Sequence, residues 1–432
     1  MYLKRMKVLL LCTICLLILG LIAAHIIAEY NRTGKSNKSD KQAMFMGNLQ
    51  HTGVYNTKDV ADNVELKWKI ETGGGIFSSP VILGNVCYFG SNDGFFYAAD
   101  AKTGKVKWKY KTGGEIRSTP AICDNIAYIT NTDGYLYAIG IEQGELKWKF
   151  ETKGEKAFDD WDMWLSSPCV HEGVVYFGSG DGNLYALDAK SGNKMWQYET
   201  QGIIHSSPAI YKDMVYFGDF KGYCYAIDIN THELKWEYKT IGYPDIPVGE
   251  IESSPTIYND IVYIGSKDHT IYALDAQQGT LIWKQQVYPG WVCSTPAVKD
   301  GIVCIGKTGS NSVYGLDTET GKLKWLYNTR FFVFSSAAIA GNTVYIGNFS
   351  GKLFALDLHT GKEKWIFQTD TSKTNYSEFF DKYGDYKRVA FTTYKEYIEK
   401  YTSNLGSFMS APVVCDGVIY FGSTDGNLYA LQ

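Results

Sequence analysis

Residues 166–199 read SSPCVHEGVVYFGSGDGNLYALDAKSGNKMWQYE, and this stretch contains one complete repeat of the chain. Its apolar runs are separated by Gly173, by the pair Asp181 and Gly182, and by Gly192, all typical turn residues. The pattern predicts four short antiparallel strands, the last of which carries Trp196.

Three signatures of this stretch recur along the chain. Tryptophans follow one another from Trp68 to Trp365 at intervals of 40, 40, 48, 40, 47, 42 and 40 residues. A Ser-Ser-Pro-like triplet and an aromatic-Ala-x-Asp-like segment each occur eight times in step with them. Four-stranded units at this period predict an all-β fold, an eight-bladed β-propeller.

The order of the signatures predicts how the ring closes. A strand over residues 65–71, with Trp68, precedes the first triplet, whereas the last unit, from Met409 to Gln432, has no tryptophan strand. We therefore expect this N-terminal strand to complete the eighth blade, which removes two open sheet edges.

These residues resemble the pyrroloquinoline-quinone-type (PQQ-like) propeller repeat, in which Ala-x-Asp is followed by Thr-Gly and then by Trp. The repeat is present as Asp100, Thr103–Gly104 and Trp108, and again as Asp357, Thr360–Gly361 and Trp365. Residues 46–53 resemble the Gly-Asn-x-Gln-His-Thr-Gly segment that precedes the first blade in many such proteins. The resemblance implies a tryptophan that packs between blades and a Thr-Gly turn that leaves room for it. The members of the PQQ-like family range from quinoprotein alcohol dehydrogenases to the non-catalytic outer-membrane barrel-assembly lipoprotein, which is a scaffold. The resemblance therefore implies a fold and not one function.

The N-terminus predicts a membrane anchor. Residues 8–28 contain no Asp, Glu, Lys or Arg and are long enough to span a bilayer as a helix. Basic residues within 1–7 favour a cytoplasmic tail there and place the rest of the chain outside the cell membrane. We expect a transmembrane signal anchor over 8–28, a linker with the preceding segment over 29–62, and the propeller over 63–432. Cleavage after Ala28 is the alternative.

Composition excludes some partners. The net charge of -4 gives no electrostatic basis for binding nucleic acid. Outside the apolar N-terminus the cysteines number seven, none adjacent to another, and most follow the apolar strand pattern. They are interpreted as buried hydrophobic residues rather than as a disulfide or metal framework. We expect a monomer.

One ring of positions varies within the constant frame. The residue before each triplet begins an innermost strand, where the central funnel of a propeller opens. Arg117, His205 and Glu252 are polar at this position, where most of their counterparts are apolar. With Trp291 they are the candidate ligand-binding residues of the funnel mouth. The simpler interpretation is that they meet water in the channel; the sharper one is a small anionic or polar ligand held by Arg117.

The acidic tract of Asp159, Asp160 and Asp162 offers oxygen ligands of the kind that Ca²⁺ prefers. Three acids so close in sequence converge on one ion only in a folded loop, so a solvated loop anchored by tryptophans is the favoured interpretation. No metal, cofactor or catalytic residue is predicted from the residues themselves.

Three insertions separate a tryptophan strand from the next triplet, at 153–163, 241–250 and 370–407. Such connections share one face of a propeller, where loops on a rigid scaffold carry binding. The insertion 370–407 predicts a helical cap. A short helix is expected over 377–384, and a second helix is expected from the capping box 393–396 onwards, with Tyr394, Ile398 and Tyr401 on one side.

Three functions remain open. The favoured one is a membrane-anchored, extracytoplasmic binding or scaffold propeller, which binds a protein or cell-envelope partner through its insertion-bearing face. The first alternative is a PQQ-dependent dehydrogenase, which by the resemblance requires Ca²⁺, a catalytic Asp and an adjacent cysteine pair that this sequence lacks. The second is a small-ligand sensor ectodomain, for which the tail 1–7 is too short to signal alone.

Overall fold

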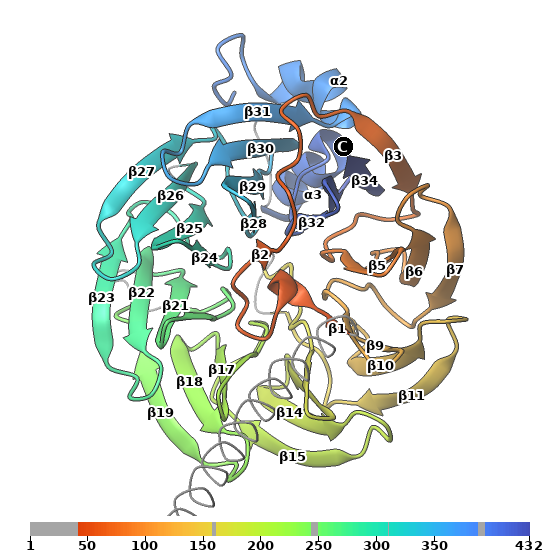
Figure 1. Cartoon of the computed structure of the whole chain (residues 1–432), viewed down its shortest axis with the longest axis vertical. Helices are drawn as coiled ribbons and strands as arrows, with labels where there is room; N and C mark the ends of the chain where they lie inside the picture. The colour runs from red at the N-terminus through yellow and green to blue at the C-terminus, as the bar shows by residue number, and fades with distance from the viewer. Residues whose placement is uncertain (1–41, 158–160, 243–248, 310, 388–393) are drawn as a thin grey trace, which may run out of the picture. The chain divides into compact units, whose positions relative to one another are not determined.

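The computed structural model describes residues 42–432 except 158–160, 243–248, 310 and 388–393. Residues Ala43–Gln432 form one compact unit. In this unit eight sheets are arranged radially around a common axis, as Figure 1 shows in a view along that axis. The eight-bladed propeller predicted from the repeats is confirmed.

Each blade has four antiparallel strands, and in the first seven blades these follow one another along the chain from inner to outer. The strands of the first four blades are β4 (Val81–Leu83), β5 (Val86–Gly90), β6 (Phe95–Asp100), β7 (Val106–Lys111); β8 (Ala121–Cys123), β9 (Ile126–Thr130), β10 (Tyr135–Gly140), β11 (Leu146–Glu151); β12 (Cys169–His171), β13 (Val174–Gly178), β14 (Asn183–Asp188), β15 (Lys194–Glu199); β16 (Ala209–Tyr211), β17 (Met214–Gly218), β18 (Tyr223–Asp228) and β19 (Leu234–Lys239).

Blades five to seven repeat this arrangement. Their strands are β20 (Thr256–Tyr258), β21 (Ile261–Ser266), β22 (Thr270–Asp275), β23 (Leu281–Gln286); β24 (Ala297–Lys299), β25 (Ile302–Lys307), β26 (Ser312–Asp317), β27 (Leu323–Asn328); β28 (Ala338–Ala340), β29 (Thr343–Gly347), β30 (Lys352–Asp357) and β31 (Glu363–Gln368).

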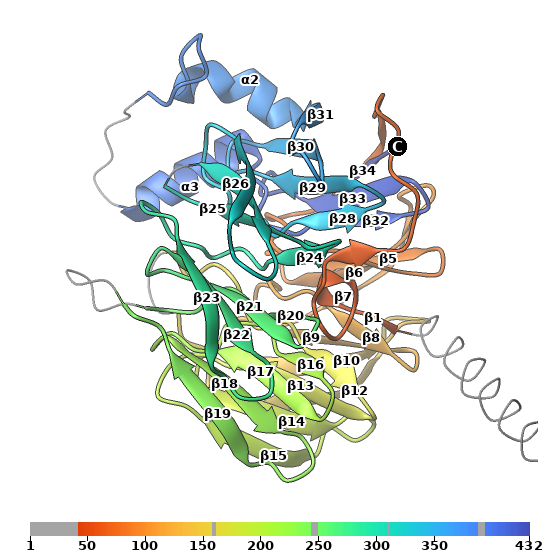
Figure 2. The ribbon, with the colours of Figure 1, turned by 60° about the vertical axis from the view of Figure 1, so that its left-hand side comes forward.

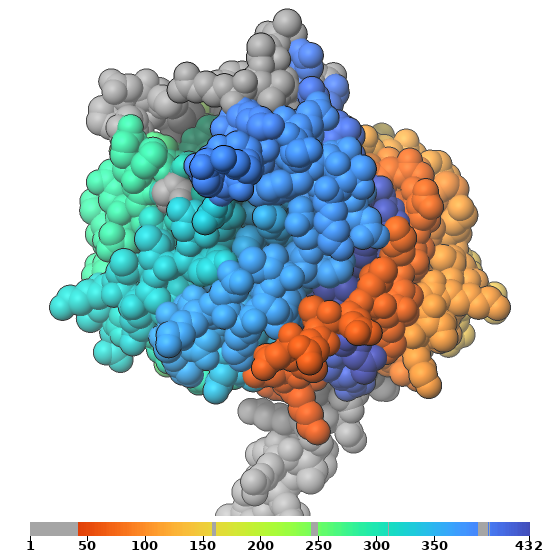
Figure 3. Space-filling model, turned by 90° about the horizontal axis from the view of Figure 1, so that it is seen from above, coloured from red at the N-terminus to blue at the C-terminus, as the bar shows by residue number. Residues whose placement is uncertain are grey.

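The eighth blade joins the two ends of the propeller. Its inner strands are β32 (Val413–Cys415), β33 (Val418–Gly422) and β34 (Asn427–Leu431), and its outer strand is β3 (Leu66–Glu71). Trp68 lies opposite Ala430, and Glu65 and Gln432 exchange both backbone hydrogen bonds at 2.9 Å. Figure 3 shows the orange N-terminal segment lying against the dark-blue C-terminal one. The predicted closure is confirmed.

The tryptophan signature has a steric basis. In the eighth blade the indole of Trp68 lies across from Ala430 and reaches the next blade, where its Nε1 donates to the Ala101 carbonyl at 3.2 Å. Gly104 in that blade has a positive φ of 72°, and a Cβ there would lie 2.8 Å from the indole. The Thr-Gly turn therefore leaves the space that the indole fills.

The segment before the first blade belongs to the propeller. It comprises a 3-10 turn (Phe45–Gly47) and the two-residue strand β2 (Val54–Tyr55), which pairs in parallel with β28; a further two-residue strand, β1, spans Gln42–Ala43. Carbonyls of residues 49–53 accept hydrogen bonds from the inner strands of four successive blades, namely from the backbone N–H groups of Ile210, Ile257, Val298 and Ile339. We call residues 44–55 the axial plug.

The insertion 370–407 contains helices α2 (Asp370–Phe379) and α3 (Tyr394–Leu405). Figure 2 shows both near the blade β28–β31. The predicted helix over 377–384 is wrong: α2 begins after Thr369, whose hydroxyl accepts from the Ser372 N–H at 3.1 Å. Gly384 instead lies in the turn between Asp381 and Asp385. The second predicted helix is confirmed by α3, and its capping residue 393 lies outside the described residues.

The predicted anchor over 8–28 also lies outside the described residues. Among the helices that the structure describes, none is both long and apolar enough to cross a bilayer.

Candidate functional site

The residues that precede the eight triplets meet around the axis. Together they line a narrow cavity of about 40 Å³, which has room for a few water molecules. These residues are Phe77, Arg117, Leu165, His205, Glu252, Cys293, Phe334 and Met409. The structure thus brings three of the four candidates together. Trp291 does not line this cavity but stands nearby, with its ring 5.2 Å from the Lys267 ammonium.

The second residue of seven of the eight triplets places a hydroxyl in the same cavity, and the eighth is Ala411. Seven of these eight residues donate their backbone N–H to the hydroxyl of the next blade, for example Ser207 N–H to Ser254 Oγ at 2.8 Å. The hydrogen bonds run from Ala411 through Ser79, Thr119, Ser167, Ser207, Ser254 and Thr295 to Ser336. These hydroxyls therefore join blade to blade, which explains the signature structurally.

The axial plug limits the cavity at one side. Phe45 is one of its lining residues, and the Phe45 ring stands edge-on to the imidazole of His51 at 5.2 Å. The His51 Nδ1 lies 3.1 Å from the Pro255 carbonyl, and burial lowers the pKa of His51 to about 4. This histidine is neutral and structural.

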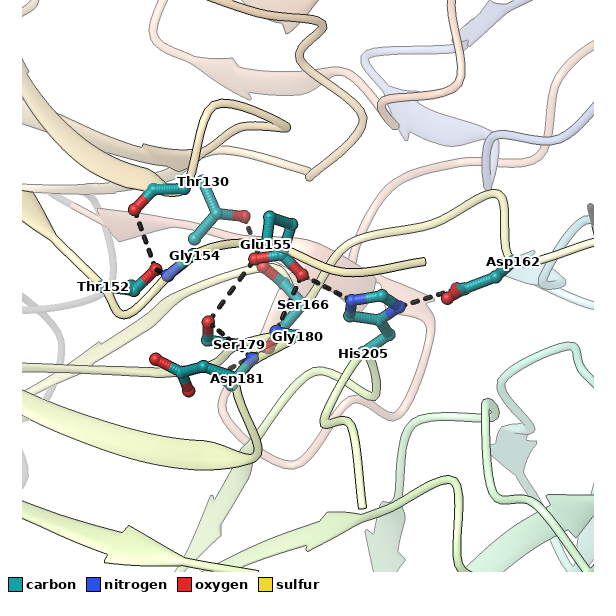
Figure 4. Close-up of polar contacts among 12 residues, drawn as sticks. Thr130, Thr152, Gly154, Glu155, Asp162, Ser166, Ser179, Gly180, Asp181 and His205 are labelled. Carbon is teal, nitrogen blue, oxygen red and sulfur yellow. Dashed lines mark hydrogen bonds and ion pairs between the residues drawn. The ribbon is translucent and has the colours of Figure 1, made fainter. Parts of the chain in front are cut away.

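His205 lies between two carboxylates. Its Nδ1 lies 2.6 Å from Asp162 and its Nε2 lies 2.6 Å from Glu155, as Figure 4 shows. Burial works against a charged imidazole, but Asp162 and Glu155 outweigh it and raise the pKa of His205 to about 10. His205 is therefore an imidazolium at neutral pH that ties the insertion 153–163 to the fourth blade.

Glu252 belongs to a second buried ion cluster. The Lys267 ammonium lies 3.5 Å from Glu252 and 3.3 Å from Glu250, and all three side chains are buried. The ammonium also lies over the rings of Phe220 and Trp291, at 5.1 and 5.2 Å. Glu252 thus does not simply meet water, as the simpler interpretation supposed.

Arg117 is more accessible than His205 and Glu252. Its Nε and Nη2 both contact the same Glu115 oxygen, at 2.8 and 2.6 Å, and its guanidinium lies 5.5 Å from the Phe77 ring centre. Arg117 and Phe77 also line a second cavity of about 410 Å³, which we call the mouth pocket. Its other walls come from the insertion 153–163, from α3 and from blade residues such as Asn92 and Thr424.

The insertions 153–163 and 370–407 meet in one aromatic cluster. The Trp161 ring stacks on Phe334 at 5.8 Å and stands edge-on to Trp291 at 6.1 Å. Trp164 donates from Nε1 to the Met409 carbonyl at 3.3 Å. The apolar side of the helices joins the same cluster through the buried side chains of Phe379, Phe380, Ile398, Tyr401 and Leu405.

The metal interpretation of the acidic tract has no geometric basis in the described residues. Asp162 is hydrogen-bonded to His205, whereas Asp159 and Asp160 lie outside the described residues. Within the described part of the chain, no three His, Cys, Asp or Glu side chains are grouped to hold a metal ion.

Comparisons with known proteins agree with this architecture. The sequence model of the family described as outer membrane protein assembly factor BamB matches residues 58–249 and 245–432. A search of curated proteins finds no sequence relative. Among solved structures, BamB from Moraxella catarrhalis is 17% identical with a TM-score of 0.64, over 85% of this chain and 97% of that chain.

Dehydrogenases share the fold as well. A europium-containing methanol dehydrogenase is 14% identical with a TM-score of 0.69, over 89% of this chain and 96% of that chain. The quinohemoprotein alcohol dehydrogenase from Comamonas testosteroni is also 14% identical with a TM-score of 0.69, over 90% of this chain and 80% of that chain. At these identities the likeness establishes the fold alone.

The repeat, the closed ring and the axial hydroxyls define a PQQ-like β-propeller. Since the family model covers nearly all of the propeller, the chain belongs to the family of outer membrane protein assembly factor BamB.

The quinone that names the repeat does not fit this axis. PQQ is a planar fused-ring tricarboxylate, and the axial cavity of about 40 Å³ is too small for it. The carboxylates of Glu155, Asp162, Glu250 and Glu252 outnumber the cations His205 and Lys267 that they surround. The mouth pocket is wide enough, but its arginine is already paired with Glu115. A tricarboxylate would meet net negative charge in both places.

Proposed function

We propose that this protein is a non-catalytic binding propeller of the cell envelope, anchored by residues 8–28, that holds a protein partner on its insertion-bearing face. The observation that carries the proposal is the aromatic cluster through which the insertions 153–163 and 370–407 pack on one face. Packed insertions on a closed ring form a pre-organised surface, which lowers the entropic cost of binding.

The charged residues of the axis support a binding role over a catalytic one. His205 and Lys267 are each held by two carboxylates, and these pairs fix loops to blades. A general acid or base needs access to substrate, whereas the side chains of His205 and Lys267 are both only 2% exposed. The ionised side chains of His205 and Lys267 therefore have a structural role.

The insertion-bearing face also presents exposed aromatic side chains. Tyr383, in the turn after α2, is 65% exposed, and Tyr288, between the fifth and sixth blades, is 61% exposed. Tyrosine is enriched at protein interfaces because it combines a large apolar area with a hydrogen-bonding hydroxyl. The apolar sequence of residues 8–28 and the membership of the outer membrane protein assembly factor BamB family support a location in the envelope.

A photo-crosslinking amino acid tests the proposal in the full-length protein in its own membrane. Placed at Tyr383, it is expected to give a discrete adduct with a partner protein. The matched control is the same amino acid at Lys190, which is exposed in the turn between β14 and β15 on the opposite face. Equal adducts at both positions, adducts at Lys190 alone, or none at either position would contradict the proposal.

A further inference from the structure

The mouth pocket is built by parts of the chain that are distant in sequence. Its volume is about 410 Å³, within the range of small-molecule sites. Phe77 and Arg117 lie just before the inner strands β4 and β8, Met163 belongs to the first insertion, and Ile398 and Thr402 belong to α3. No single blade forms it, so the pocket exists only because the two insertions fold over the ring.

The charges around the pocket favour a neutral ligand. Glu115 neutralises Arg117 through a contact of 2.6 Å, and the walls also include the carboxylates of Asp162 and Glu399. An anion would be repelled by these carboxylates, and Arg117 and Asp162 are each already in an ion pair, so neither offers an unpaired charge to a charged ligand. Asp162 already has His205 as its counter-ion.

The hydrogen-bonding groups require a ligand that both donates and accepts. Three hydroxyls of the pocket donate their protons to backbone carbonyls. Thr402 donates to the carbonyl of Ile398 at 2.8 Å, Ser403 to that of Glu399 at 2.6 Å, and Thr424 to that of Thr402 at 2.6 Å. Toward the pocket these hydroxyls therefore act as acceptors.

Two further groups complete this set. Arg117 can only donate, and Glu115 occupies two of the five N–H groups of its guanidinium. Asn92 also lines the pocket, and its buried Oδ1 has no hydrogen-bond partner among the described residues. A ligand that matches these groups carries several donors and several acceptors at its edge.

The apolar groups match a flat C–H surface. Phe77, Met163 and Ile398 line the same pocket, so its polar groups surround an apolar area. A pyranose ring has this combination of properties: it is neutral, its hydroxyls donate and accept, and its C–H face packs on aromatic and aliphatic side chains. The geometry points to the mouth pocket as a binding site for a neutral sugar residue. This inference goes beyond the proposed scaffold role and does not depend on it.

Ligand-detected NMR with the full-length protein tests the inference. The probes are the methyl glycosides of glucose, galactose, mannose and N-acetylglucosamine, compared with N-acetylglutamine amide, citrate and butylamine. At least one glycoside is expected to receive saturation at its ring C–H protons and to bind more tightly than the other three compounds. Binding of none of the glycosides, or tighter binding of the amide, the anion or the amine, would overturn it.

Variants locate the site. Thr402→Val keeps the shape of the side chain and removes an acceptor, and Arg117→Ala removes the donors; each is expected to weaken glycoside binding about five- to tenfold. Arg330→Ala is the control, because Arg330 is an exposed arginine that does not line the pocket. If folded Thr402→Val and Arg117→Ala proteins bound the glycoside as tightly as the wild type, the assignment to this pocket would be wrong.

Discussion

At the scale of single residues, His205 shows how a titratable group near the axis stabilises the fold. Its pKa is about 10 in the folded chain against an ordinary value of 6.5, so folding favours the protonated imidazole. The corresponding stabilisation is fully present below pH 6.5 and is lost as the pH rises through about 10. Of the two carboxylates that hold the imidazolium, that of Asp162 is fully buried and that of Glu155 is 11% exposed.

Replacing His205 by Gln is expected to lower the free energy of unfolding by about 3–5 kcal/mol at neutral pH, because two buried carboxylates lose their counter-ion. Urea unfolding measured from about pH 6 to 10 should show the loss shrinking toward the upper end of this range. The control is His359→Gln, at an exposed histidine in a turn. A loss independent of pH would show that His205 is not protonated in the folded chain.

The ion clusters also show what a repeat can reveal at the residue scale. Arg117, His205 and Glu252 were identifiable because they break a constant frame at a known position. Glu155, which pairs with His205, and Glu250, which shares Lys267 with Glu252, lie in insertions, whose conformation no repeat determines. Lys267 could have been identified from the sequence, because it is the one charged residue at its hairpin position in the eight blades. The other seven blades have uncharged residues there, namely Asn92, Thr132, Gly180, Phe220, Thr308, Phe349 and Thr424.

At the scale of elements, the turn between the third and fourth strands and the tryptophan of the preceding blade form one unit. Gly104→Ala should destabilise the fold by the cost of a positive φ, about 1–2 kcal/mol, plus about 1–3 kcal/mol for displacing the Trp68 indole. Gly173→Ala is the matched control, because Gly173 has a similar φ of 80° with nothing within 4 Å of the added Cβ. Equal losses in urea unfolding would contradict the steric account.

The helices of the insertion mark where element prediction failed. Ser377 and Gly384 have the chemistry of a helix start and stop, but the same residue types serve turns. Thr369 caps the helix instead, and Ser377 lies in its last turn. The strands were predictable because eight copies of one pattern reinforce each other, whereas the insertion occurs once. The helix α3 was predictable because Ile398 and Tyr401 repeat at helical spacing and are buried.

At the scale of the whole molecule, closure and central packing come from the N-terminal part of the propeller. The strand β3 completes the eighth blade, and the axial plug joins the inner strands of four others. The closing strand was predictable from the order of the signatures. The plug's path was not, because its hydrogen bonds are made by backbone groups, which leave no pattern in the sequence.

We propose that the charged residues around the axis hold the propeller together and that the protein binds a partner rather than oxidising a substrate. The most direct test is a titration of the full-length protein with PQQ and Ca²⁺, followed by absorbance and by alcohol-dependent dye reduction, with a quinoprotein alcohol dehydrogenase in parallel. If this proposal holds, the quinone spectrum shows no saturable change and dye reduction does not rise above background. A saturable bound-quinone spectrum together with alcohol oxidation would contradict it.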